Sequence, residues 1–461
     1  MRRVLIASLG LLVLGLPAGW QCTQQSQRAG TTGPNADSTD ALAADVMEAR
    51  SMAAAIDQFQ DKEAPSPADS AALHRRADSL RKTGSSRQGE TPDRARDRLR
   101  QALRAYRVLA DSTGMAKSMR AIGGMYRQKS QYEAAMARYD SSLALHRMLG
   151  NREGEASALN DIGVVHRKQG RYEEALSHYR KALAIRQEIG DREGTAATLN
   201  NMGLVFWDQD KYDPALARYE ESLSIKRELG DREGVATTLN NMGLVLWNQS
   251  EYERAVTRYK ESLVMKRKLG DREGVAATLN NVGIILWKQG EYDRALSHYE
   301  ESLSVKREMG AREGVARTLN NIGLVYKDQG QYEEALSRYR TSIAMKREIG
   351  DPEGLARTLS NVGNVYRTQG EYEEALSRYE ESLAIKREIG DRGGAARTLK
   401  DIGSLYRRQG EYEEALVHYE EALTIRRELG NREGIANNLT QIGRTRRKQG
   451  RPKEALSYFH R

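Results

Sequence analysis

The feature that most constrains this chain is a repeat of 40 residues that runs through most of its length. One glycine and one aromatic residue recur in each period, in nine successive units without insertion or deletion. The glycines are Gly123, Gly163, Gly203, Gly243, Gly283, Gly323, Gly363, Gly403 and Gly443, and the aromatic series is Tyr139, Tyr179, Tyr219, Tyr259, Tyr299, Tyr339, Tyr379, Tyr419 and Phe459. Such a period is typical of arrays in which each unit packs on its neighbours. We therefore expect one elongated array rather than several globular domains.

Each unit contains two stretches with the periodicity of an amphipathic helix. Leu319, Ile322 and Tyr326 fall on one face of the first stretch. The second has a face made of Tyr332, Ala335, Leu336, Tyr339 and Ile343. Gly350 followed by Asp351 is typical of one helix ending and the next being capped. No segment alternates apolar and polar residues, so no strand is expected.

The recurrent glycine falls inside the first helix of each unit. Glycine in a helix costs about 1 kcal/mol relative to alanine, so nine recurrences indicate a compensating contact. We expect the second helix to approach the first closely at Gly323 and at its counterparts.

This pattern resembles the tetratricopeptide repeat. The residues that carry the resemblance are Leu319, Ile322, Gly323 and Tyr326, followed by Ala335 and Tyr339. The 40-residue spacing and the phrases GDREG, LNNIG and YEEAL are similar to the long-repeat subclass, which includes kinesin light chains and the Leu-Gly-Asn adaptors of G-protein signalling. The resemblance implies an all-α, right-handed solenoid of antiparallel helix pairs. The proline of the 34-residue form is absent, and the second helix continues into a charged turn such as Lys346-Arg347-Glu348.

Four regions follow from these patterns. They are a signal segment (1–21), a polar tether that can include one short helix (22–65), an atypical N-terminal capping repeat (66–110) and an array of about nine repeats (111–461). In the capping repeat, Ala95, Leu99 and Ala102 keep the register of a second helix. Residues 66–82 are its expected partner.

The first residues have the pattern of an export signal. A basic start (1–3) is followed by an uncharged apolar run (4–16), which is too short for a membrane span of about 20 residues but fits a signal peptide. We expect a periplasmic or membrane-anchored protein; the alternative is a cytoplasmic one. Cys22 resembles the lipidated cysteine of bacterial lipoproteins. Because Gln21 precedes it, cleavage near Ala18 without lipid is favoured.

The face of the first helix opposite its core stripe is the candidate peptide-binding surface, which we call the first-helix face. At 100° per residue it comprises Arg317, Asn320, Leu324, Lys327, Asp328 and their equivalents. The resemblance implies that this face lines a concave groove. An asparagine series on it comprises Asn160, Asn200, Asn240, Asn280 and Asn320. These amides suit the backbone of an extended peptide, unless they are solvated or bond a neighbouring helix. In the Leu-Gly-Asn adaptors a groove asparagine follows the repeat glycine, and here only Asn364 matches it.

An apolar section of the same face contains three tryptophans with an aliphatic residue one turn before each. These residues are Trp207, Trp247, Trp287, Leu204, Leu244 and Ile284. Exposed tryptophan is unusual and is enriched at binding hot spots. The section therefore suggests a floor for apolar side chains, with packing between repeats as the alternative.

Toward the C-terminus the first-helix face becomes basic. The cations are Arg357, Arg367, Arg397, Lys400, Arg407, Arg408, Arg444, Arg447 and Lys448, and no acidic residue occupies this face in the last three repeats. One uniform sign attracts acidic segments, and arginine forms bidentate pairs with carboxylates or phosphates. The alternative is a solvated face that pairs with glutamates of neighbouring helices.

Motifs for catalysis, metals and cofactors are absent from the sequence. It lacks GxxxxGK[ST], GxSxG and HExxH, and its histidines do not have metal-ligand spacing. His178, His298 and His418 replace outer arginines and are expected to be solvated. We expect no enzyme activity, no cofactor and no metal site.

The expected function is a protein-interaction scaffold that binds an extended, acidic peptide in its groove. The alternatives are a cytosolic adaptor or regulator in signalling and, less favoured, a binder of polyanions or nucleic acid through the basic C-terminal end. No polar capping helix follows the last repeat, although solenoids usually need one. This predicts self-association through the C-terminal end.

Overall fold

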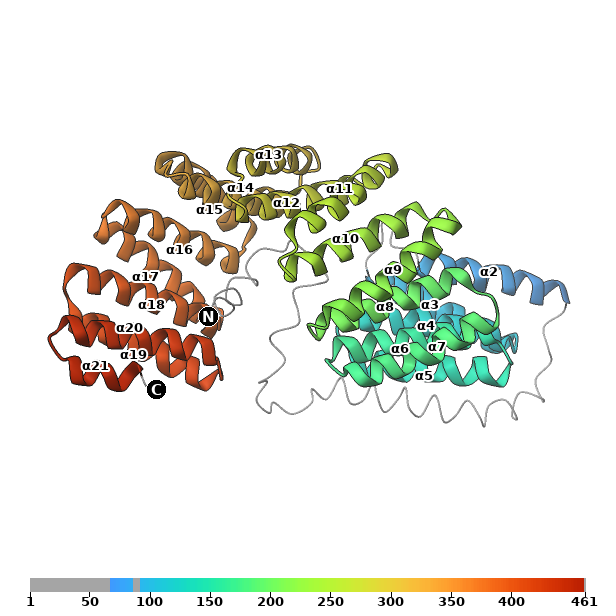
Figure 1. The fold of residues 1–461 in the computed structure, drawn as a ribbon. Coiled ribbons are helices and arrows are strands. Elements are labelled where there is room, and N and C mark those ends of the chain that lie inside the picture. Colours follow the sequence, from blue (N-terminus) through green and yellow to red (C-terminus); the bar gives the residue numbers. More distant parts are fainter. Residues whose placement is uncertain (1–66, 86–91, 460–461) are drawn as a thin grey trace. The chain divides into compact units, whose positions relative to one another are not determined.

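The computed structural model describes residues 67–85 and 92–459. The signal segment, the polar tether and Cys22 lie outside them. The described residues form twenty helices and no strand (Figure 1), which confirms the all-α solenoid of helix pairs. The first helices of the pairs are α2 (Pro67–Ser85), α4 (Ser112–Gln128), α6 (Arg152–Lys168), α8 (Arg192–Asp208), α10 (Arg232–Asn248), α12 (Arg272–Lys288), α14 (Arg312–Asp328), α16 (Pro352–Gln369), α18 (Arg392–Gln409) and α20 (Arg432–Lys448). The second helices are α3 (Pro92–Val108), α5 (Tyr132–Met148), α7 (Tyr172–Glu188), α9 (Tyr212–Leu229), α11 (Tyr252–Leu269), α13 (Tyr292–Glu308), α15 (Tyr332–Ile349), α17 (Tyr372–Glu388), α19 (Tyr412–Glu428) and α21 (Pro452–Phe459).

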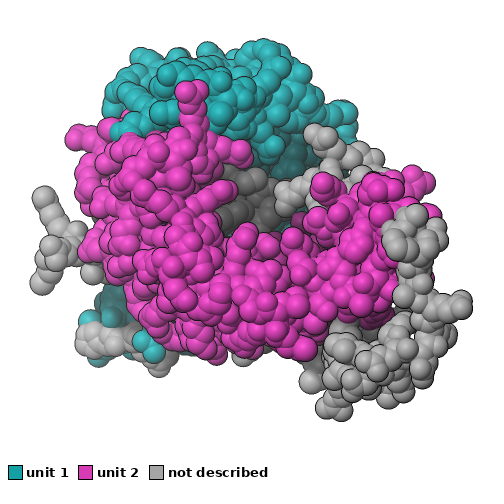
Figure 2. Space-filling view, turned by 90° about the vertical axis from the view of Figure 1, so that its right-hand side faces the viewer, with its two compact units in different colours: residues 1–16, 259–461 teal, residues 17–258 magenta. Residues whose placement is uncertain are grey.

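From α2 to α10 and from α12 to α21, consecutive helices pack on each other, as α15 packs on α14 and on α16. The described chain falls into two compact units, residues 67–258 and residues 259–459 (Figure 2). Each unit has its own hydrophobic core between the two helices of a pair and the next pair. The contacts discussed below all lie within one unit.

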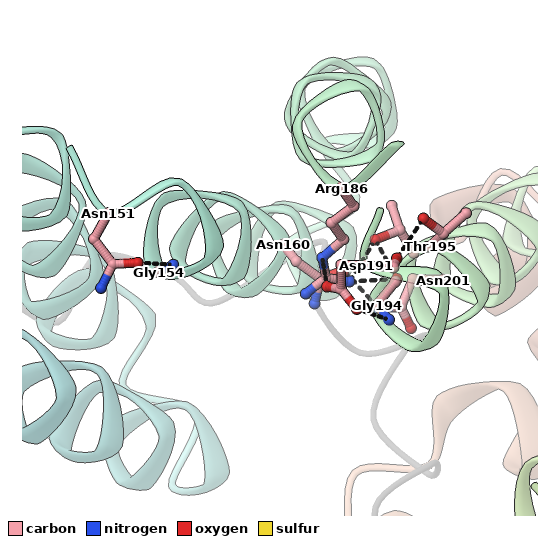
Figure 3. Close-up of polar contacts among 9 residues, drawn as sticks. Asn151, Gly154, Asn160, Arg186, Asp191, Gly194, Thr195 and Asn201 are labelled. Atoms are coloured by element: carbon pink, nitrogen blue, oxygen red, sulfur yellow. Dashed lines mark hydrogen bonds and ion pairs between the residues drawn. The ribbon is translucent and has the colours of Figure 1, made fainter. Parts of the chain in front are cut away.

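The junctions between repeats have the predicted glycine and cap. Gly350 has a left-handed φ of 68°, and the Asp351 carboxylate accepts a hydrogen bond from the Gly354 N–H at 2.8 Å. Figure 3 shows the same cap at Asn151 and at Asp191. The first helix α14 differs, because Ala311 occupies its cap position and no side chain bonds its first turn.

The close approach expected at the recurrent glycine is confirmed. A Cβ atom on Gly323 would lie 2.6 Å from Cε1 of Tyr339, whose ring is fully buried. In the last repeat, Gly443 meets Phe459 at the same distance. The glycine therefore leaves room for an aromatic ring of the second helix.

A buried lysine lies beneath most junctions, where the sequence indicated only a charged turn. The Nζ atoms of Lys306 and Lys346 donate hydrogen bonds of 2.7 Å to Oγ1 of Thr318 and Thr358. Burial lowers the pKa of Lys306 to about 7 and that of Lys346 to about 8. The same bond recurs at Lys226, Lys266 and Lys386. The lysine thus joins one second helix to the next first helix.

The tyrosine hydroxyls provide a matched pair of substitutions. The Tyr379 hydroxyl donates to Asn364 Oδ1 at 2.9 Å, whereas the Tyr339 hydroxyl is buried without a partner among the described residues. We expect Tyr379→Phe to lower the local unfolding free energy by about 1 kcal/mol and Tyr339→Phe to leave it unchanged or raise it. Native-state hydrogen exchange of α15 and α17 measures both. Equal losses in the two variants would contradict this assignment.

Candidate functional site

Within each unit, first helices of neighbouring repeats are joined in one register, in which a side chain at residue i bonds the side chain at residue i+41. Several side-chain hydrogen bonds among the described residues have this spacing. They are Arg120–Asp161 (2.6 Å), Asn160–Asn201 (3.1 Å), Arg167–Asp208 (3.0 Å), Asn200–Asn241 (3.4 Å), Asn280–Asn321 (3.0 Å), Trp287–Asp328 (2.8 Å) and Asn320–Asn361 (3.0 Å). This register identifies neighbours on the first-helix face.

The asparagine series lies at the contact between neighbouring first helices. Asn160, Asn200 and Asn240 are half-buried, and Asn280 and Asn320 are buried. Oδ1 of each of four members accepts a hydrogen bond from the asparagine 41 residues later; these members are Asn160, Asn200, Asn280 and Asn320. Figure 3 includes one such pair, Asn160 and Asn201. These amides therefore form hydrogen bonds to a neighbouring helix, which is the alternative to binding the backbone of a peptide.

The aliphatic residues of the apolar section are buried rather than open. Leu204 and Leu244, in the unit of residues 67–258, are 9% and 6% exposed, and Ile284, in the unit of residues 259–459, is 2% exposed. They pack between helices, so they do not form an accessible floor.

The three tryptophan rings are half-buried. The Trp287 indole N–H donates to Asp328, and Lys288 Nζ lies 4.9 Å from the centroid of the Trp287 ring. The Trp247 ring packs on Tyr252 with 5.2 Å between centroids. These rings take part in packing within and between repeats, and only part of each surface remains for a ligand.

Three side chains of the basic section have polar partners. Arg357 pairs with Glu353 at 2.6 Å and Lys400 with Asp401 at 3.2 Å. Arg367 donates to Asn364 Oδ1 at 3.1 Å. Over 67–85 and 92–459, no acidic group lies within ion-pair distance of the remaining members, which are Arg397, Arg407, Arg408, Arg444, Arg447 and Lys448. All of these are exposed except Arg407, which is half-buried.

The register places some of these cations beside each other. Counting 41 residues from Arg367 leads to Arg408, and from Arg407 to Lys448. In the repeats upstream the same register joins Arg167 to Asp208. We call Arg367 with Arg408, and Arg407 with Lys448, the two cation pairs. Because like charges repel at short range, an anion between them would stabilise each pair. In the sequence, these pairs are visible only as basic residues spaced 41 apart. The structure shows why this spacing matters, because it joins neighbouring first helices.

The outer histidines are half-buried, so the expectation that they are solvated is wrong. His178 stacks on His166 with 5.2 Å between ring centroids, and His418 stacks on Tyr406 at 5.4 Å. Desolvation lowers the pKa of His178 to about 4. No group of three potential metal ligands occurs in the described part of the chain. Nor does any described helix have the length and apolar character needed to cross a membrane.

Comparison with known proteins gives a family match and a set of similar folds. The family described as "Tetratricopeptide repeat" matches residues 154–228, 234–308, 314–388 and 394–461. No curated protein matches the chain.

Three solved structures illustrate the similar folds. The quorum sensor NprR from B. thuringiensis is 16% identical with a TM-score of 0.53, covering 77% of this chain and 98% of that one. A signal transduction ATPase with a tetratricopeptide repeat sensor, from Pyrococcus horikoshii, is 15% identical with a TM-score of 0.59 (78% and 53%). Aspartyl phosphate phosphatase F from Bacillus subtilis is 13% identical with a TM-score of 0.50 (80% and 96%).

Proposed function

Because the chain belongs to the tetratricopeptide repeat family, we propose that it is a non-enzymatic scaffold that binds an extended, acidic segment of another protein along the first helices α16, α18 and α20. The observation that carries the proposal is the pair of neighbouring cations at Arg407 and Lys448, with no acidic partner among the described residues. Carboxylates of a bound segment would take the place that Asp208 has beside Arg167 upstream.

The spacing of the repeats suggests how the acidic residues of this segment are arranged. Packed helices lie about 8–10 Å apart, and an extended chain advances about 3.3 Å per residue. Two carboxylates that reach the two cation pairs are therefore about three residues apart in the partner. A regularly spaced acidic peptide is the simplest probe of this arrangement.

We expect Arg408→Glu with Lys448→Glu to weaken binding of an acidic peptide at least about tenfold. Both side chains are exposed, so the fold should tolerate the change. The probe is a fluorescein-labelled peptide of four Glu-Gly-Ser units, and fluorescence anisotropy with the full chain measures the dissociation constant.

Lys181→Glu with Lys260→Glu is the matched control, because it reverses the same number of exposed charges on second helices. It should change the dissociation constant by less than about twofold. The stronger variant replaces Arg397, Lys400, Arg407 and Arg408 by glutamate. If this variant binds the same partners as the wild-type chain, the proposal that an acidic segment binds along α16, α18 and α20 is wrong. Tighter binding to heparin than to the peptide, with a steep salt dependence, would favour the polyanion binder.

Export is part of the proposal and is supported by the basic start (1–3) and the apolar run (4–16) alone. Cys22 is the site at which a lipid would tether the protein to a membrane. Cell fractionation with a tag that reports cleavage of the signal segment separates this location from the cytosolic adaptor. Self-association through the C-terminal end stays a prediction.

A further inference from the structure

A recurrent glutamate on the second helices neutralises arginines. Arg347 of α15 donates to Glu381 of α17 at 2.7 Å, and Arg387 pairs with Glu421 in the same way, 34 residues apart. Glu381 also accepts from Arg378 of its own helix at 3.1 Å. One carboxylate at this position therefore serves an arginine of the preceding second helix and an arginine three residues before it.

Helix α15 lacks this carboxylate. Thr341 occupies the position held by Glu221, Glu301, Glu381 and Glu421 in other repeats. The two arginines that it would serve are Arg307 and Arg338. In the preceding position, Arg340 replaces the glutamates Glu220, Glu300, Glu380 and Glu420. Within the described ranges none of Arg307, Arg338 and Arg340 forms a side-chain hydrogen bond or ion pair. The two successive second helices α13 and α15 thus carry three guanidinium groups that have no acidic partner among the described residues.

An apolar pocket of about 280 Å³ opens beside Arg340, between α15, α16 and α17. Its apolar lining includes Leu336, Ile343, Leu359, Val362 and Tyr366. Ile343 stands where the other repeats have leucine, and it is half-buried. The equivalent Leu383 is only 6% exposed. A β-branched residue extends less far from the helix than leucine does, which gives a physical reason for the pocket.

We infer that this surface of α15 is a second binding site, separate from the first-helix face. Its occupant is a partner protein segment that has a carboxylate next to an aliphatic side chain. The carboxylate would pair with Arg340, the unpaired guanidinium group that lines the pocket, and the aliphatic group would fill the pocket. A ligand with charge alone would leave the apolar lining in water, so charge and pocket together favour a peptide over a polyanion.

Methyl NMR of the full chain tests the site, because the Ile343 δ1 methyl group is a reporter inside the pocket. The probe is a blocked peptide, Gly-Ser-Glu-Leu-Ser-Gly, and Ile343→Leu assigns the reporter signal. The Ile343 signal should shift saturably with this peptide. Peptides in which Gln replaces Glu, or Ser replaces Leu, should bind with a dissociation constant at least about tenfold higher in the same titration.

The decisive variant is Arg340→Glu with Thr341→Glu, which restores the residues of neighbouring repeats at exposed positions and should fold normally. This variant should bind the Glu-Leu peptide at least about tenfold more weakly than the wild-type chain does. Lys260→Glu, at the equivalent of Arg340 two repeats earlier, should leave peptide binding unchanged. Arg408→Glu with Lys448→Glu, the variant on the first-helix face, should leave this titration unchanged. This result separates the two sites. No saturable shift, equal shifts with the Gln peptide, or a shift only with RNA or anionic vesicles would overturn the proposal.

Discussion

Gly123→Ala is expected to destabilise the first regular repeat by about 3 kcal/mol, at the upper end of the usual cost of overpacking. The new Cβ atom would lie 2.8 Å from Cε1 of Tyr139, whose ring is 1% exposed, and 3.2 Å from the Ala135 carbonyl oxygen. Neither the buried ring nor the backbone can move without separating α4 from α5. This outweighs the gain of about 1 kcal/mol from removing a helical glycine. Native-state hydrogen exchange of α4 and α5 measures the loss.

The next residue provides the control. A Cβ atom on Gly124 would come no closer than 3.7 Å to the Tyr139 hydroxyl oxygen, which is ordinary van der Waals contact. Gly124→Ala should therefore raise the stability of the same helix by up to about 1 kcal/mol. If both alanine variants lose or both gain stability, the glycine series does not serve to accommodate the tyrosine rings.

The helix pair itself could be predicted because its determinants are local. The face of Leu319, Ile322 and Tyr326, the close approach at Gly323 and the cap at Asp351 all depend on spacing within one repeat. Each of these expectations required only helix geometry and the chemistry of helix ends.

The use of the first-helix face could not be predicted in the same way, because it depends on how one pair is rotated against the next. Asn320 looks like a free amide in a single helix, but Asn361 reaches it from the following repeat. Lys306 looks like part of a charged turn, but the next first helix covers it. The spacing of 41 was present in the sequence, and its meaning is a property of the stack.

The same register divides the first-helix face into two parts. Where the register joins complementary groups, such as Arg167 and Asp208, neighbouring first helices bond each other and the charges on the face are paired. Where it places Arg407 beside Lys448, the face lacks an acidic partner within the described part of the chain. The basic section therefore carries the binding proposal, and the apolar section contributes mainly to packing.

Between pH 7 and 10, the pH dependence of stability should have its largest single contribution at the junction between α13 and α14. The Lys306 side chain is 7% exposed, and its pKa falls from 10.5 to about 7 because of burial and, secondarily, of Arg317. Its counterparts Lys226, Lys266, Lys346 and Lys386 each have a cap aspartate that raises the pKa. At this junction Ala311 replaces the aspartate.

The sign follows from the protons bound in each state. Between pH 7 and 10.5 the unfolded chain holds the Lys306 proton and the folded chain releases it, so the stability of this junction rises with pH. The slope of this contribution is at most about 1.4 kcal/mol per pH unit, and the full cost of the buried cation is present below pH 7. Hydrogen exchange of α13 and α14 should therefore show greater protection, after correction for the intrinsic rate, at pH 9 than at pH 7.

Ala311→Asp should reduce this pH dependence and stabilise the junction at pH 7 by at least about 1 kcal/mol. The new carboxylate would cap the Gly314 N–H, as Asp351 caps Gly354, and would raise the pKa of Lys306. Lys306→Met should remove the dependence altogether, whereas Lys226→Met, where Asp231 opposes the shift, should change it less. A junction whose stability falls between pH 7 and 9, or that responds equally to the two methionine variants, would contradict the role assigned to Ala311.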